Sequence, residues 1–120
     1  MPFQPGDLVT VDFPGVTGIK RRPAVVLSSA TYHALRPDTI VGLITTRSSG
    51  FSATDYELQD WSAAGLRVAS VFRSFIVTLP PSANLILIGH LSERDWKSVC
   101  MCVKVALAAL EDSSNTTESL

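Results

Sequence analysis

Short segments of β-branched and other apolar residues, separated by glycine and proline, make up most of the chain before residue 91, and this pattern constrains the fold most. β-branched residues favour the pleated geometry of a strand, and glycine and proline mark the turns between strands. The segments are 8–13, 24–27, 39–45, 55–58, 69–73, 75–79 and 85–90. The segments 69–73 and 75–79 fit either two strands or one bent strand. We therefore predict a mainly β (α+β) domain built as a small, strongly bent barrel.

The apolar pattern changes from a period of two to a helical period after residue 91. Ser92 and Asp95 have the form of a capping box, with Asp where Glu is usual. The apolar face that follows is formed by Trp96, Val99, Cys100, Val103, Leu107 and Leu110. This spacing predicts a C-terminal α-helix.

Two shorter helical pieces are expected earlier in the chain. Ser28 or Ser29 can cap a short helix over 30–35, which a following proline prevents from continuing. Asp60 can cap a single turn that ends at Gly65. The chain is thus expected to combine several strands with short helices and one longer helix at its end.

At 120 residues, with 46% apolar and 18% charged residues, the chain is long enough for one domain with a single core. We expect this domain to span 1–111 and the polar residues 112–120 to form a disordered tail. The surplus of apolar residues favours a subunit interface. Because the net charge is only −1, a nucleic-acid site would have to be a local cluster of positive charge.

The sequence favours a cytoplasmic protein. Its first residues lack the basic start and apolar run of a secretory signal, and no apolar run approaches the roughly 20 residues of a membrane helix. Cys100 and Cys102 lie two apart on the expected helix, so their side chains point to different faces and cannot form a disulfide with each other. Together with the distant His33 and His90 they do not make a zinc site, and we expect Cys100 to pack in the core.

The sequence Lys20-Arg21-Arg22-Pro23 is the clearest local cluster of positive charge. Proline has no backbone donor and favours extended geometry in the residue before it, so Arg22 is expected at the start of the strand 24–27. A guanidinium keeps its charge and presents a fixed fork of donors suited to phosphate. The alternative interpretation of Arg22 is a solvated or salt-bridged arginine at the start of a strand.

Three groups of residues together resemble one known family. They are Gly6–Pro14 with Lys20–Ser28, then Leu43–Thr45, and then Ser70–Arg73 with Val77–Leu79 and Gly89–Ser92. In this order and spacing they are similar to the MazF/PemK-like toxins of bacterial type II toxin–antitoxin systems. The resemblance extends from Gly6 to about Leu110, which is nearly the whole chain.

The resemblance implies an SH3-like barrel of the CcdB/MazF type, a homodimer, and a metal-independent endoribonuclease that uses no cofactor. Such an enzyme cleaves single-stranded RNA to a 2′,3′-cyclic phosphate and a free 5′-hydroxyl, and it is inhibited by a cognate antitoxin with an acidic segment. The resemblance also implies that Arg22 and Thr45 are the catalytic pair, and that Arg73 contacts RNA or helps catalysis.

These residue types suit the proposed chemistry, and each also has a structural alternative. Arg22 can stabilise charge on the phosphoryl oxygens, and Thr45 can donate a hydrogen bond to one of them. Thr45 also suits any strand, and Arg73 is equally compatible with an interface ion pair. The remaining basic residues of the expected RNA surface, which attract phosphate if they face one groove, are Lys20, Arg21 and Arg47.

A binding module is the alternative function: the same barrel, either catalytically inactive or directed at DNA gyrase as the CcdB toxins are. Phe75 stands where many relatives carry an acidic residue, so no side chain has an obvious claim to removing the 2′ proton. Trp61 suits base stacking or, more often, a place in the core. We interpret His33 and His90 as structural or surface residues. The match to the family's catalytic arginine at Arg22 favours the endoribonuclease over the binding module.

Overall fold

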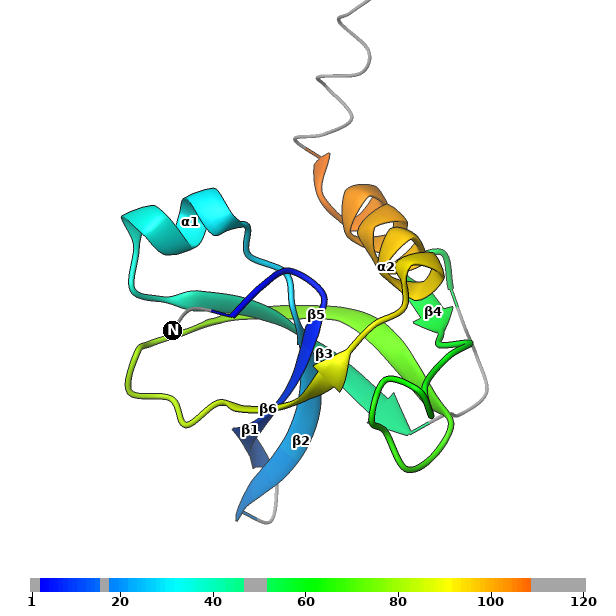
Figure 1. The fold of residues 1–120 in the computed structure, drawn as a ribbon, viewed down its shortest axis with the longest axis horizontal. Coiled ribbons are helices and arrows are strands. Elements are labelled where there is room, and N and C mark those ends of the chain that lie inside the picture. The colour runs from blue at the N-terminus through cyan, green and yellow to red at the C-terminus, as the bar shows by residue number, and fades with distance from the viewer. Residues whose placement is uncertain (1–2, 16–17, 47–51, 109–120) are drawn as a thin grey trace, which may run out of the picture.

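The computed structural model describes residues 3–15, 18–46 and 52–108. Its elements are β1 (Asp7–Gly15), β2 (Gly18–Val26), α1 (Ala30–Leu35), β3 (Thr39–Thr46), β4 (Asp55–Glu57), β5 (Ser70–Leu79), β6 (Ile86–His90) and α2 (Glu93–Ala106). The strands form one antiparallel sheet in the order β4-β5-β3-β2-β1-β6. The predicted mainly β, α+β class is confirmed. The sheet bends strongly (Figure 1), but β4 and β6 remain its two edge strands, so the barrel is not closed.

Successive side chains of a strand point to opposite faces, and here both faces of the sheet bury apolar residues. The cluster on one face includes Leu8, Val25, Ile44, Phe72, Val99 and Cys102, the last two from α2. The cluster on the other face is formed by Val9, Val11, Ala24, Val26 and Val41. Because α2 packs against β4 and β5, it covers the sheet at the end opposite β6. The middle of β2 is therefore buried on both faces, as its unbroken apolar sequence predicts.

The predicted ends of the helices are largely confirmed, and much of the predicted apolar face of α2 is too: Val99 is buried, and Trp96 and Val103 pack against the core. Ser29 caps α1, and the Ser92 hydroxyl caps α2 by accepting the Asp95 backbone N–H at 3.2 Å. The buried residues of α2 are Asp95, Val99 and Cys102. The prediction that Cys100 packs in the core is therefore wrong: Cys100 is exposed, because the inward stripe starts from a polar residue that the apolar pattern does not reveal.

Of the two alternatives for the segment 69–79, the structure shows the single strand, β5 (Ser70–Leu79). One strand prediction differs from the structure. β2 begins at Gly18, so Arg22 lies inside this strand and not at its start. The reason is the pairing with β1, which runs from Gly15↔Gly18 to Leu8↔Val25 and holds the basic residues in an extended hairpin.

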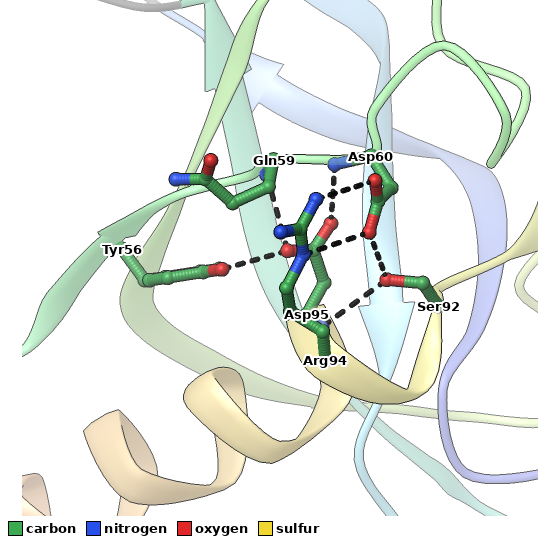
Figure 2. Close-up of polar contacts among 6 residues, drawn as sticks. All are labelled: Tyr56, Gln59, Asp60, Ser92, Arg94 and Asp95. Atoms are coloured by element: carbon green, nitrogen blue, oxygen red, sulfur yellow. Dashed lines mark hydrogen bonds and ion pairs between the residues drawn. The ribbon is translucent and has the colours of Figure 1, made fainter.

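The buried carboxylate of Asp95 fixes the β4–β5 loop (residues 58–69) to the start of α2 (Figure 2). It accepts hydrogen bonds from the Tyr56 hydroxyl at 2.7 Å and from the backbone N–H groups of Gln59 and Asp60 at 3.1 and 2.8 Å. A carboxylate without solvent contact is tolerated only when donors surround it in this way. The second half of the predicted capping box is therefore wrong, since this side chain binds the loop and not the backbone of Ser92.

The far part of the same loop packs against β6 through two glycines. A single turn from Asp60 ends at Gly65, as predicted, and Gly65 has a φ of +104°, in the region that favours glycine. A side chain on Gly89 of β6 would overlap the carbonyl oxygen of Ala64. The predicted cap by the Asp60 side chain is wrong, because its carboxylate binds Ser92 and Arg94 instead (Figure 2). Glycine at both contact points thus brings the loop close to the sheet.

Candidate active site

A groove of about 810 Å³ is lined by residues of the β4–β5 loop and of the C-terminal end of β3. Its polar and charged lining consists of Thr10, Arg21, Arg22, Thr45, Thr46, Arg67 and Ser70. Its apolar lining consists of Pro23, Ile44, Leu66, Val68 and Ile88, with Gly65 between them. These lining residues include three arginines and neither aspartate nor glutamate. The groove therefore has the electrostatic character of an anion-binding site.

Arg22 and Thr45, the predicted catalytic pair, line the same groove. The β2–β3 ladder pairs Ala24 with Leu43 and Val26 with Val41, and the same register continued by two residues places Arg22 opposite Thr45. The β2–β3 pairing stops at Ala24, next to Pro23, which has no N–H to offer a neighbouring strand. Both side chains are half-buried. The strand pairing thus brings a guanidinium and a hydroxyl to one rim of the sheet.

The arginines of the described residues fall into two groups. Arg21, Arg36, Arg73 and Arg94 each form an ion pair, with Asp12, Asp38, Asp55 and Asp60 respectively. Within the described chain, the side chains of Arg22 and Arg67 have no hydrogen-bond or ion-pair partner, and both line the groove. Among the described residues, the two guanidiniums that remain free for a ligand are therefore found in one place.

Arg21 lines the groove, but most of its donors are already used. Its Nη1 donates to the Asp12 carboxylate at 2.9 Å, while Nη2 donates to the backbone oxygen and hydroxyl of Thr10 at 2.9 and 3.0 Å. Nη2 also donates to the backbone oxygen of Asn84 at 2.8 Å. Arg21 therefore ties β2 to β1 and to the segment before β6, and this structural role was not predicted.

The other basic residues singled out in the sequence lie elsewhere. Arg73 is not among the residues lining the groove; its Nη1 lies 2.9 Å from the carboxylate of Asp55, and the pair connects β5 with the start of β4. Lys20 is exposed on β2 and is not a lining residue either. Arg47 lies outside the described residues. Of the predicted RNA-binding and catalytic residues, the structure thus brings Arg21, Arg22 and Thr45 together.

Arg67 is the lining residue that sequence reasoning missed. It follows the turn that Gly65 ends, and its charge stands alone between apolar neighbours in the sequence. A lone arginine after a glycine turn is too common to identify a site. Only the packing of the β4–β5 loop against β6 shows that this arginine reaches the groove.

His33, His90 and Trp61, the other side chains considered for a functional role, contact neighbouring residues of the fold. The Ser28 hydroxyl lies 3.0 Å from His33 Nε2, and His90 Nδ1 lies 2.8 Å from the Asp7 carboxylate. Trp61 packs against the core cluster that includes Val99 and Cys102 of α2. A place in the core therefore describes Trp61 better than a role in base stacking. In residues 3–15, 18–46 and 52–108, no three His, Cys, Asp or Glu side chains gather in a way that could hold a metal ion. Over the same ranges, no helix is long and apolar enough to cross a membrane.

A family model supplies the decisive comparison. Residues 4–107 match the model that describes the PemK-like, MazF-like toxin of type II toxin–antitoxin systems. This chain belongs to that toxin family. A comparison with curated proteins gives no significant match.

Solved MazF-like toxin structures share the fold. MazF from Deinococcus radiodurans superposes with a TM-score of 0.71 and 23% identity, over 90% of this chain and 98% of that one. An endoribonuclease from a mycobacterial species, solved with its cognate antitoxin, gives a TM-score of 0.70 and 16% identity, over 90% and 96%. The MazE–MazF complex from Deinococcus radiodurans gives a TM-score of 0.65 and 21% identity, over 88% of this chain and 95% of that one. The MazF-like architecture predicted from the sequence is therefore confirmed.

Proposed function

We propose that this MazF-like toxin is an endoribonuclease that cleaves single-stranded RNA in the groove and needs no metal ion. The observation that carries the proposal is that Arg22, whose side chain has no partner in the described chain, and Thr45 line one groove whose described lining residues include no carboxylate. Membership of the toxin family supports it, as does the similar fold of a mycobacterial endoribonuclease.

The 2′-hydroxyl of RNA is itself the nucleophile, so the groove residues need only assist its attack on the adjacent phosphorus. The 2′-oxygen bonds to the adjacent phosphorus, the bond from phosphorus to the 5′-oxygen breaks, the 2′ proton leaves and the departing oxygen takes up a proton. Arg22 stabilises the negative charge on the phosphoryl oxygens, and Thr45 donates a hydrogen bond to one of them. The products are a 2′,3′-cyclic phosphate and a free 5′-hydroxyl.

The proposed protein partners follow from charge and apolar surface. A groove with free arginines favours an acidic antitoxin segment as the inhibitor, and MazF-like proteins of similar fold were solved with their antitoxins. Exposed apolar side chains favour a homodimer; they include Val68, Phe75, Ile86, Leu87 and Met101. We place this complex in the cytoplasm, which suits the free thiols of Cys100 and Cys102.

Incubation of the pure protein with a mixture of single-stranded RNAs in excess chelator tests the activity, with Arg22→Ala as the control variant. The proposal predicts that the wild-type protein cuts and that the variant does not. Absence of cutting by the wild-type protein on diverse RNAs would contradict it and favour the binding module. In that case, inhibition of DNA gyrase supercoiling would identify the gyrase-directed form of the module.

A further inference from the structure

The second free arginine of the groove has no assigned task. Arg67 comes from the β4–β5 loop, whereas Arg22 comes from β2, so the two guanidiniums approach the groove from different elements. We propose that Arg67 binds a second phosphate of the RNA strand, beside the phosphate that is cut, and that it acts on substrate binding and not on bond breaking. This inference rests on the proposed function.

The backbone on both sides of Arg67 is held by hydrogen bonds. The N–H of Leu66 donates to the backbone oxygen of Trp61 at 3.0 Å. The Ser70 hydroxyl, which is buried, donates to the backbone oxygen of Val68 at 2.8 Å. Arg67 therefore extends from a fixed backbone, and less entropy is lost when its side chain binds a ligand.

The loop that carries Arg67 is also held by contacts further from Arg67 along the chain. At its start, the buried Asp95 carboxylate holds Gln59 and Asp60 (Figure 2). At its far part, Gly65 lies against the backbone of Ile88, where an added Cβ would come 2.5 Å from the carbonyl oxygen. A loop fixed at both places is suited to present a charged side chain at a constant position.

The charge of Arg67 is also unopposed. Arg21 is already neutralised by Asp12, and the described residues that line the groove include no aspartate or glutamate. Arg67 is exposed, so water and salt screen it, and its contribution to binding must depend on ionic strength. A volume of about 810 Å³ exceeds what a single phosphate group fills and lies in the range of pockets for larger ligands.

The test measures binding separately from cleavage. A fluorescein-labelled 2′-O-methyl RNA of mixed sequence cannot be cut, and its affinity is measured by anisotropy at several KCl concentrations. The variants are Arg67→Ala and Arg67→Lys, with Lys104→Ala as the control. Lys104 is an exposed lysine in the last turn of α2, so its replacement removes one positive charge away from the groove. With a cleavable RNA, steady-state rates at several substrate concentrations give kcat and KM separately.

We expect Arg67→Ala to weaken binding about ten- to hundredfold and to reduce the salt slope by about 0.7, as for one lost phosphate contact. KM should rise by a similar factor while kcat stays within about twofold. Arg67→Lys should keep the slope, and Lys104→Ala should bind like the wild-type protein.

The outcomes separate this inference from the proposed function. If the wild-type protein binds and cuts RNA but Arg67→Ala has the same affinity and salt slope, the inference is overturned and the nuclease stands. A loss of kcat at unchanged affinity would also overturn it, since Arg67 would then act in bond breaking. If the wild-type protein binds no RNA even at low salt, the proposed function fails and this inference fails with it.

Discussion

Arg22 of β2 and Thr45 of β3 line one groove, each two residues beyond Ala24 and Leu43, where the antiparallel pairing of their strands ends. The relationship depends on strand pairing, so it is fixed by the backbone of the sheet and not by a flexible loop. Pro23 ends the β2–β3 ladder beside Arg22, which leaves this side chain and the hydroxyl of Thr45 accessible from the groove. A preorganised donor pair of this kind is what stabilisation of a charged transition state requires.

Replacement of Arg22 by alanine should remove cleavage without unfolding the protein. The side chain is half-exposed and has no partner in the described chain, so its loss should change the free energy of unfolding by less than about 0.5 kcal/mol. The cleavage rate should fall by about 10²–10³, as for one lost oxyanion donor. Single-turnover rates and thermal melts measure the two effects.

Arg21, the neighbouring residue, should behave in the opposite way. Arg21→Ala removes the donors that bind Asp12, Thr10 and the backbone of Asn84, so it should lower the free energy of unfolding by about 1–2 kcal/mol. Urea denaturation measures this change, with Lys20→Ala on the same strand as the control. Equal stability of the two variants would show that the Arg21 contacts contribute nothing.

The hydroxyl of Thr45 should matter more than its shape. Thr45→Val keeps the β-branched side chain and removes the donor, so the cleavage rate should fall by about 10- to 100-fold with little change in stability. Thr45→Ser, which restores the hydroxyl, should recover most of the rate. Wild-type activity of the valine variant would exclude a role for the hydroxyl in the reaction.

Loss of the Asp95 carboxylate should destabilise the fold. Asp95→Ala leaves three donors without their acceptor and should lower the free energy of unfolding by about 3 kcal/mol or more. Tyr56→Phe removes one donor of the same network and should lower it by about 1 kcal/mol. Chemical denaturation of both variants tests the network even if the alanine variant does not fold.

The ion pair between Asp60 and Arg94 should make stability depend on pH in the acid range. Hydrogen bonds from Arg94 and then from Ser92 lower the pKa of Asp60 below its ordinary value of 3.8. The stabilisation by the ionised carboxylate is therefore complete above that value and is lost as the pH falls through the lower pKa of the folded state. Unfolding midpoints of the wild-type protein and Arg94→Gln should differ at pH 6 and converge toward pH 2. A constant difference over this range would contradict the prediction.

Local sequence patterns predicted the strands and helix ends because glycine, proline and capping residues act over a few positions. The burial of Asp95 in α2 could not be predicted, since its carboxylate binds donors 35, 36 and 39 residues away in the sequence. The structural role of Arg21 could not be predicted either, because its partner Asn84 lies 63 residues away in the sequence. Arg22 and Thr45 were found through a family resemblance, whereas Arg67 required the packing of a loop that no local pattern reveals.

The most direct test of the central claim uses the nucleophile of the substrate. An RNA with a single mapped cleavage position is compared, in excess chelator, with the same oligonucleotide carrying one 2′-deoxynucleotide on the 5′ side of that bond. If the 2′-hydroxyl is the nucleophile, only the all-RNA strand is cut and mass spectrometry finds a 2′,3′-cyclic phosphate on its 5′ fragment. Cleavage of the deoxy-substituted strand at the same bond, or a product with a 5′-phosphate, would contradict it.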